Sequence, residues 1–198
     1  MRRLVLLRHG ETPWNAERRW QGQTDVELSE LGHLQAKAVA PALAAYAPVA
    51  LWCSDLARAV QTAAYVGERV GLEPRHDRRL RETSAGAIEG LTTDEIWARH
   101  GTTRPELSAL GGESADAVAD RVAAALAEVG AALDAGETAV VVSHGTAVRH
   151  GISRLMGWPV DVDSALRGMS NCGWAELVSE GDEGPWRLAA YNRTAPIS

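Results

Sequence analysis

Three short apolar runs divide the chain into units that each end in polar residues. The runs cover residues 4–7, 49–53 and 138–142, and each has the length of a strand that is buried on both faces of a sheet. A helical pattern follows each run. This alternation of strands and helices predicts an α/β fold with a mainly parallel sheet.

Capping residues indicate where the helices begin. Ser29 is the predicted N-cap of an alanine-rich helix to about residue 46, in which Pro41 should cause a kink or the loss of a hydrogen bond. Asp55 is the predicted N-cap of a helix through about residue 70, which Gly71 should end. The helix after the third run is expected over about residues 146–156.

The rest of the chain contains two more helical signals and a hairpin signal. Residues 92–95 form a capping box for a short helix, and Ser114 should begin a long alanine-rich helix that ends near Gly136. Residues 101–112 between these helices are expected to form a loop. Near the C-terminus, two apolar segments flank the turn-like sequence EGDEG and predict a hairpin: residues 174–178 and 186–190.

Length and composition predict one water-soluble domain over residues 1–198. Hydrophobic residues make up 45% of the chain and charged residues 23%, which is ordinary for globular proteins. No apolar run approaches the roughly 20 residues that span a bilayer, and the four apolar residues after Arg3 are too few for a signal peptide. We therefore expect a cytoplasmic location and no membrane partner.

The cysteine count and the net charge exclude two further classes of protein. Cys53 and Cys172 are too few for a disulfide framework and are interpreted as buried or partly buried thiols. The formal net charge of −6 argues against a nucleic-acid partner, since such proteins usually carry a basic excess. An anionic ligand would need cations that are concentrated locally.

Basic and polar residues follow each of the three apolar runs. Ligands of parallel sheets bind at the carboxyl ends of the strands, so the residues after each run should converge on one crevice. Glu82, in the loop sequence RLRE, could overhang the same edge. The converging residues are Arg8 and His9, then Ser54, Asp55 and Arg58, and finally Ser143, His144 and Gly145.

This combination of side chains suits a phosphate dianion. Guanidinium groups bind phosphate oxygens bidentately, and a helix N-terminus adds unsatisfied N–H groups. A neutral imidazole can attack phosphorus and become a phosphohistidine, while a nearby carboxylic acid can protonate the departing alkoxide. The residues at this edge therefore predict phosphoryl transfer.

Several ordered segments resemble the histidine phosphatase superfamily, also called the phosphoglycerate mutase-like family. The resemblance extends over nearly the whole chain and implies a three-layer α/β sandwich, in which helices flank a mainly parallel central sheet. The segments are LLRHGET with Asn15 after it, QGQTDVELSELG at 21–32, SDLARAVQTA at 54–63, LRET at 80–83, GGES at 111–114 and VSHGTAVR at 142–149.

The resemblance also implies roles for individual residues. His9 would be the phosphorylated nucleophile and Glu82 the proton donor, in a hydrolase that needs no metal or other cofactor. Arg8, Arg58 and a protonated His144 would hold the phosphate of a small-molecule monoester. The residues implied to line the substrate phosphate or its neighbours are Asn15, Gln21 and the backbone near Gly22 and Gly145.

Each of these roles has a simpler alternative. Glu82 could form a surface ion pair with the arginines of RLRE. A metal site on His9 and His144 would need further ligands, and no HxH, HExxH or CxxC motif accompanies them. The residues interpreted as structural or solvated are His33, His76, His100 and His150. Core packing is the preferred role for Trp14, Trp20 and Trp97, and an apolar or sugar-stacking wall is the alternative.

The main rival within the family is a cofactor-dependent phosphoglycerate mutase. Those mutases resemble one another in a long insertion after the glutamate, with a lysine and paired arginines. Residues 83–112 are short, contain no lysine and offer only Arg99 and Arg104 singly, which favours hydrolysis. Residues 168–177 and 186–192 resemble the phosphatase branch that includes glucosyl-3-phosphoglycerate phosphatase. Other sugar or glycerate phosphates, a non-catalytic binding module and a homodimer stay open.

Overall fold

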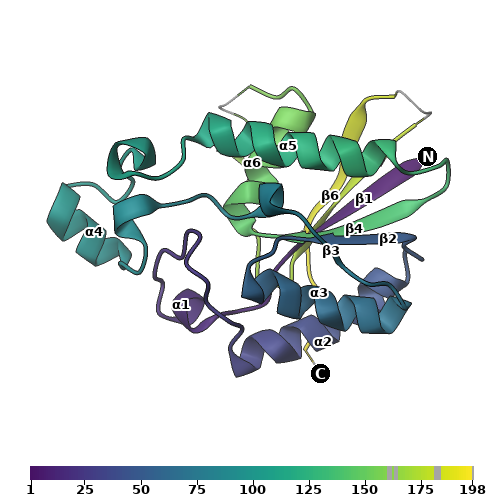
Figure 1. Cartoon of the computed structure of the whole chain (residues 1–198), viewed down its shortest axis with the longest axis horizontal. Helices are drawn as coiled ribbons and strands as arrows, with labels where there is room; N and C mark the ends of the chain where they lie inside the picture. The colour runs from purple at the N-terminus through teal and green to yellow at the C-terminus, as the bar shows by residue number, and fades with distance from the viewer. Residues whose placement is uncertain (160–161, 163–164, 181–183, 198) are drawn as a thin grey trace.

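The centre of the molecule is a six-stranded sheet with the strand order β3-β2-β4-β1-β5-β6 (Figure 1). The computed structural model describes residues 1–159, 162, 165–180 and 184–197. The pairs β2–β3, β2–β4 and β1–β4 are parallel, whereas β1–β5 and β5–β6 are antiparallel. The strands are β1 (Arg2–Arg8), β2 (Ala50–Cys53), β3 (Arg75–His76), β4 (Thr138–Ser143), β5 (Trp174–Ser179) and β6 (Trp186–Arg193).

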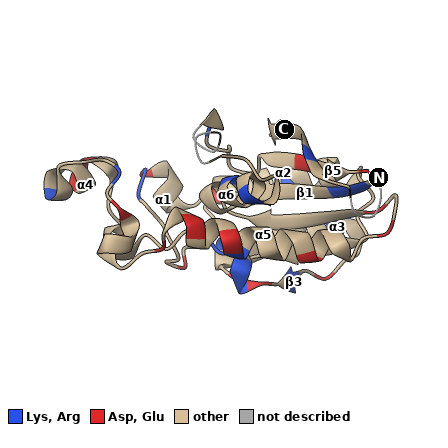
Figure 2. Ribbon diagram, turned by 90° about the horizontal axis from the view of Figure 1, so that it is seen from above, with Lys and Arg blue, Asp and Glu red and all other residues tan. Residues whose placement is uncertain are grey.

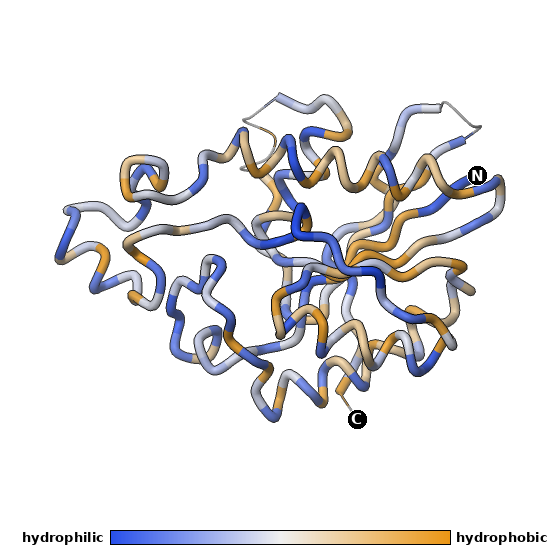
Figure 3. Tube along the Cα trace, viewed as in Figure 1, coloured by the Kyte–Doolittle hydropathy of each residue, from blue (hydrophilic) through white to orange (hydrophobic). Residues whose placement is uncertain are grey.

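Helices cover both faces of this sheet and give three layers (Figure 1). The covering helices are α2 (Glu30–Ala44), α3 (Ala57–Val70), α5 (Ala115–Ala131) and α6 (Gly145–Leu155). Successive strand residues point to opposite faces, so Leu4 and Leu6 of β1 pack with α5 and α6, while Val5 and Leu7 pack with α2 and α3. Apolar residues are accordingly concentrated on the central strands (Figure 3). The expected three-layer α/β fold is confirmed.

Most of the predicted elements are present within a few residues of their expected bounds. Ser29 caps α2 by accepting a hydrogen bond from Gly32 N–H, and α2 continues past Pro41, which lies in its last turn. The capping box of Thr92 and Glu95 begins α4 (Thr93–His100). The strands β5 and β6 pair as the hairpin signal predicts, but residues 181–183 of its turn lie outside the described residues.

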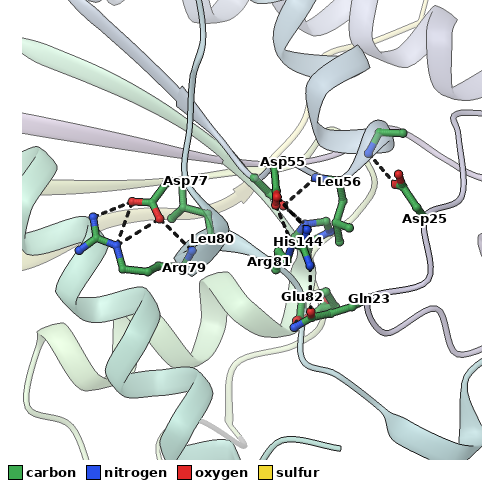
Figure 4. A network of polar contacts seen from close by, with 12 residues as sticks. Gln23, Asp25, Asp55, Leu56, Asp77, Arg79, Leu80, Arg81, Glu82 and His144 are labelled. Atoms are coloured by element: carbon green, nitrogen blue, oxygen red, sulfur yellow. Dashed lines mark hydrogen bonds and ion pairs between the residues drawn. The ribbon is translucent and has the colours of Figure 1, made fainter.

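Two predicted helix ends and one burial pattern are wrong. Helix α3 begins after Leu56, and its Ala57 N–H donates to Asp25 at 2.7 Å, because the predicted cap, Asp55, pairs with Arg81 instead (Figure 4). Helix α5 ends at Ala131, well before Gly136, since a turn over residues 134–137 leads into β4. Strand β2 alternates between buried and partly buried residues, because only the short β3 separates it from the sheet edge.

The segment between β3 and α5 extends away from the sheet (Figures 1 and 2). It contains three short 3₁₀ helices and α4, so the expected loop over 101–112 has a helical turn at Leu107–Leu110. The sequence patterns did not predict these turns or α1 (Pro13–Ala16). Among the described residues, no helix has the length and apolar character needed to cross a membrane.

Candidate active site

A pocket of about 480 Å³ lies beside the carboxyl ends of β1 and β4. His144 is fully buried behind its wall, with its ring centroid 5.1 Å from that of His9, and Gly145 lies next to the Arg8 side chain. No cluster of three or more His, Cys, Asp and Glu residues in the described ranges could hold a metal ion. The predicted site residues that line the pocket are Arg8, His9, Asn15, Gln21, Gly22, Arg58 and Glu82.

His9 follows β1 directly and is only 3% exposed. Its Nδ1 lies 2.6 Å from the carbonyl oxygen of Gly10, and because a carbonyl can only accept, Nδ1 carries the proton and Nε2 keeps its lone pair. Burial, together with the charges of Arg58 and Arg8, lowers the pKa of His9 well below 6.5. The imidazole is therefore neutral near pH 7 and has the lone pair that a nucleophile needs.

Arg58, on α3, is fully buried and holds the loop that forms one wall of the pocket. Its Nη2 donates to the carbonyl oxygen of Gly22 at 2.8 Å and its Nη1 to that of Thr24 at 2.9 Å. Burial is the main cause that lowers the pKa of Arg58 to about 10, so the guanidinium keeps its charge at neutral pH. Its Nε donates to His144, so among the described residues these three bonds leave two of its five N–H groups available for a ligand.

Arg8 contributes a second, partly buried guanidinium to the same pocket. Its Nη1 donates to the carbonyl oxygen of Met169. Among the described residues, the buried Nε of Arg8 has no hydrogen-bond partner. Buried donors are rarely left unsatisfied, and an oxygen of a bound phosphate would satisfy this one.

His144 is the N-cap of α6, and both of its ring nitrogens are hydrogen bonded. Nδ1 accepts from Arg58 Nε at 3.2 Å, which places the proton on Nε2, 2.9 Å from Ser54 Oγ. Burial, followed by the charge of Arg58, lowers the pKa of His144 well below 6.5. The expected protonated His144 is therefore wrong, because its imidazole is neutral, and Arg8 and Arg58 supply the positive charge beside it.

Glu82 lies between the pocket and the N-terminus of α6. Its Oε1 accepts from the N–H groups of Thr83 at 2.8 Å and Ala147 at 2.9 Å, and its Oε2 accepts from Thr146 N–H at 3.1 Å. The surface ion pair suggested as an alternative is wrong, because Arg79 binds Asp77 and Arg81 binds Asp55 (Figure 4). Arg79 also binds Glu128. The carboxyl group is held at the pocket wall instead.

The pocket also contains residues that the sequence analysis missed. His150, interpreted as structural or solvated, lies in its wall beside Arg149. A helical signal was present for Arg149, which follows Gly145 by four residues and so lies on the same face of α6. Trp20 both lines the pocket, as the alternative of a wall predicted, and packs on a small outer core. Trp97 is 58% exposed, so core packing is wrong for Trp97.

Comparison with known proteins identifies the family. The model of the histidine phosphatase superfamily (branch 1) matches residues 4–194. The chain belongs to this superfamily. It is 39% identical over 220 residues to a glucosyl-3-phosphoglycerate phosphatase of Mycobacterium tuberculosis, a match that covers 100% of this chain and 97% of that relative. The predicted resemblance and the predicted phosphatase activity are thus confirmed.

Two further similarities extend this result. A solved structure of a mycobacterial glucosyl-3-phosphoglycerate phosphatase in complex with VO3 has a TM-score of 0.88 and 38% identity, and covers 98% of this histidine phosphatase and 100% of that chain. A probable phosphoglycerate mutase of Salmonella paratyphi A is 35% identical over 200 residues, which cover 96% of this chain and 90% of the relative. Both the phosphatase and the mutase names therefore occur among its relatives.

The buried neutral histidines predict a pH-dependent stability. Below pH 6.5 the unfolded chain protonates His9 and His144 while the folded chain leaves them neutral, so the unfolded state binds more protons. The free energy of unfolding should therefore fall as the pH is lowered, by at most about 1.4 kcal/mol per pH unit for each histidine. Urea unfolding at about pH 7.5 and pH 5.5 measures the difference.

Variants assign this pH dependence to a residue. His9→Asn should lose less stability between the two pH values than the parent protein does. His76→Asn, at an exposed position, should lose as much as the parent protein. The same loss in the parent and in His9→Asn would contradict a neutral, buried His9.

Proposed function

We propose that this phosphatase acts as a single catalytic domain that hydrolyses phosphate monoesters of small sugar or glycerate metabolites, glucosyl-3-phosphoglycerate in particular, through a phosphohistidine on His9. The observation that carries the proposal is the state of His9, a buried, neutral imidazole whose Nδ1–H donates to the carbonyl oxygen of Gly10. Arg8 and Arg58 line the same pocket. The nucleophile and the charges that attract its substrate come together at one point.

In the first step His9 Nε2 attacks phosphorus as the bond from phosphorus to the ester oxygen breaks. The leaving oxygen takes a proton from Glu82, and Oε2 is the oxygen that can carry it, since Oε1 already accepts two backbone hydrogen bonds. Arg8 and Arg58 stabilise the charge on the phosphoryl oxygens. The products of this step are an alcohol, a phosphohistidine and an ionised Glu82.

In the second step water hydrolyses the phosphohistidine. The Glu82 carboxylate now accepts a proton from the water that attacks phosphorus, and the bond between phosphorus and Nε2 breaks. Inorganic phosphate leaves, His9 is neutral again and Glu82 is protonated again. The same carboxyl group therefore serves as acid and then as base, as microscopic reversibility requires.

The pocket also supports a substrate that is larger than phosphate and carries a second anion. Its volume of about 480 Å³ lies in the range of sites for small molecules. Arg104 and Arg149 line it in addition to Arg8 and Arg58, so a glycerate carboxylate would meet positive charge. The similarity to glucosyl-3-phosphoglycerate phosphatases points to the same substrate class.

A mutase is the second candidate, because a probable phosphoglycerate mutase is 35% identical to this chain. Such an enzyme must keep its phosphohistidine away from water until the substrate has turned around. Residues 83–112 are shorter than the insertion of the mutases, contain no lysine and supply the pocket with one arginine, Arg104, where the mutases have a pair. We therefore favour hydrolysis over isomerisation.

The covalent intermediate is directly testable. After brief mixing with a radiolabelled phosphate ester and an alkaline quench, which phosphohistidine survives, the label should be found on His9. His9→Ala should take up no label, whereas His76→Ala, at an exposed position, should be labelled like the parent protein. Label on another residue, or full activity of His9→Ala, would exclude the mechanism.

A second experiment isolates the proton donated by Glu82. Glu82→Gln keeps the shape of the side chain but has no acidic proton, so single-turnover release of an alkyl alcohol should slow by a factor on the order of 10² to 10⁴. Release of nitrophenol, which can leave unprotonated, should slow much less. Rapid-quench measurements compare the two esters, and equal losses would mean that Glu82 organises the pocket without donating a proton.

A third experiment separates phosphatase from mutase. With 3-phosphoglycerate and catalytic 2,3-bisphosphoglycerate, the protein should release inorganic phosphate and form little 2-phosphoglycerate. Inorganic phosphate is measured by colorimetry, and the two phosphoglycerate isomers are measured by phosphorus NMR spectroscopy. Rapid isomerisation without free phosphate would overturn the preference for hydrolysis and would leave the role of His9 intact.

A further inference from the structure

The proposed mechanism gives no role to the motif GGES, residues 111–114. Its Glu113 lies just before α5 and forms a bidentate ion pair with Arg121 of that helix, with both N–O distances at 2.8 Å. Burial raises the pKa of Glu113, but hydrogen bonds from Arg121 and Ser84 outweigh it and lower the pKa below its usual value. The pair is therefore ionised at neutral pH.

The remaining donors of Arg121 hold the backbone on one side of Glu82. Nη1 donates to the carbonyl oxygens of Arg79 at 2.7 Å and Arg81 at 2.6 Å, and Nη2 donates to that of Glu82 at 2.9 Å. With the two bonds to Glu113, all five N–H groups of this guanidinium have acceptors. Lysine, with three donors, cannot reproduce this arrangement.

Glu113 holds the other side of Glu82. Its Oε2 accepts from Ser84 N–H at 2.9 Å and from Gln23 Nε2 at 3.1 Å. Gln23 Nε2 also lies 3.1 Å from the carbonyl oxygen of Glu82 (Figure 4). The Glu113–Arg121 clamp, meaning these two side chains, thus fixes the peptide groups before and after Glu82.

The clamp determines where the Glu82 carboxyl group can lie. The segment that carries Glu82 is irregular, with only a three-residue 3₁₀ helix before it, so no regular hydrogen-bond ladder holds it. With the backbone fixed by the clamp, the side chain reaches the N–H groups of Thr146 and Ala147 at the start of α6. The carboxyl group is then held between the clamp, formed by Arg121 of α5 and Glu113 just before it, and the first turn of α6.

We propose that Glu113 and Arg121 are positioning residues for proton transfer: they hold the backbone of Glu82 so that its carboxyl group meets the leaving oxygen of the substrate. This inference rests on the proposed role of Glu82 as the proton donor. Displacement of a catalytic group by about 1 Å can slow a reaction by about 10²-fold. Loss of the clamp should therefore slow the transfers that need a proton more than those that do not.

The test compares two esters in single-turnover, rapid-quench experiments. Arg121→Lys should slow the release of the alcohol from an alkyl phosphate by about 10- to 100-fold. Release of nitrophenol from p-nitrophenyl phosphate should slow much less. The matched control is Arg154→Lys, which changes an exposed arginine paired with Asp116 and Asp120 and should leave both rates unchanged.

A double variant decides whether the effect acts through Glu82. With Glu82→Gln already present, Arg121→Lys should cause no further loss with the alkyl phosphate. An equal loss with both esters, or the same factor in the presence and absence of Glu82→Gln, would overturn the positioning role. If Glu82→Gln alone does not distinguish the esters, the proton-donor role fails and the positioning role fails with it. If Glu82→Gln slows the alkyl phosphate more than the nitrophenyl phosphate but Arg121→Lys slows both equally, the positioning role is wrong and the proton-donor role stands.

Glu113→Gln provides a second variant in case Arg121→Lys does not fold. Glutamine keeps one carbonyl oxygen for Ser84 N–H but loses the bidentate pair with Arg121. Glu113→Gln should also slow the release of the alcohol from the alkyl phosphate more than the release of nitrophenol from the nitrophenyl phosphate. A loss of equal size with both esters would count against the clamp, whatever the behaviour of Arg121→Lys.

Discussion

The complete burial of the Arg58 guanidinium is the constraint on which the rest of the site depends. A buried charge is costly unless hydrogen bonds satisfy it, and here the acceptors are two loop carbonyls and the imidazole of His144. The loop over residues 22–24 must therefore fold back onto α3. Burial and then this same charge lower the pKa of His9 and His144, so the buried cation fixes a wall of the pocket and helps to keep the proposed nucleophile neutral.

The N–H groups at the N-terminus of α6 bind the Glu82 carboxyl group, so other groups must bind the phosphate. A helix N-terminus is a ready anion site, and phosphate would be an obvious occupant. Here the Glu82 carboxyl group accepts from Thr146 and Ala147 N–H, so this position is taken by the chain itself. The arginines are then left to attract the phosphate, while the helix orients the proposed acid. Anion binding and proton transfer are assigned to different groups that lie within one pocket.

The sequence predicts those features that depend on local patterns. Apolar runs located β1 and β4, capping residues located the starts of α2 and α4, and strand ends located Arg8 and His9. The local sequence patterns did not predict the contacts between segments that are far apart in the chain. Asp55 had the right position for a cap, but the choice between Asp55 and Asp25 depends on where Arg81 lies in space. In the sequence, Arg121 and Glu113 are two ordinary charged residues near the start of a helix. The five acceptors of the Arg121 guanidinium come together only when the loop around Glu82 is folded.

The neutral state of the two histidines also makes the proton count of the site depend on its ligand. In the free site, burial and two guanidinium groups disfavour a charged imidazole. A phosphate dianion beside them supplies opposite charge, which favours the protonated form of a nearby imidazole. In the proposed mechanism His9 must stay neutral to attack, because its lone pair becomes the bond to phosphorus. His144 has no such requirement, and its Nε2–H already donates to Ser54 Oγ. Protonation of His144 at Nδ1 would cost the hydrogen bond that Nδ1 accepts from Arg58 Nε, and this cost opposes the effect of the dianion.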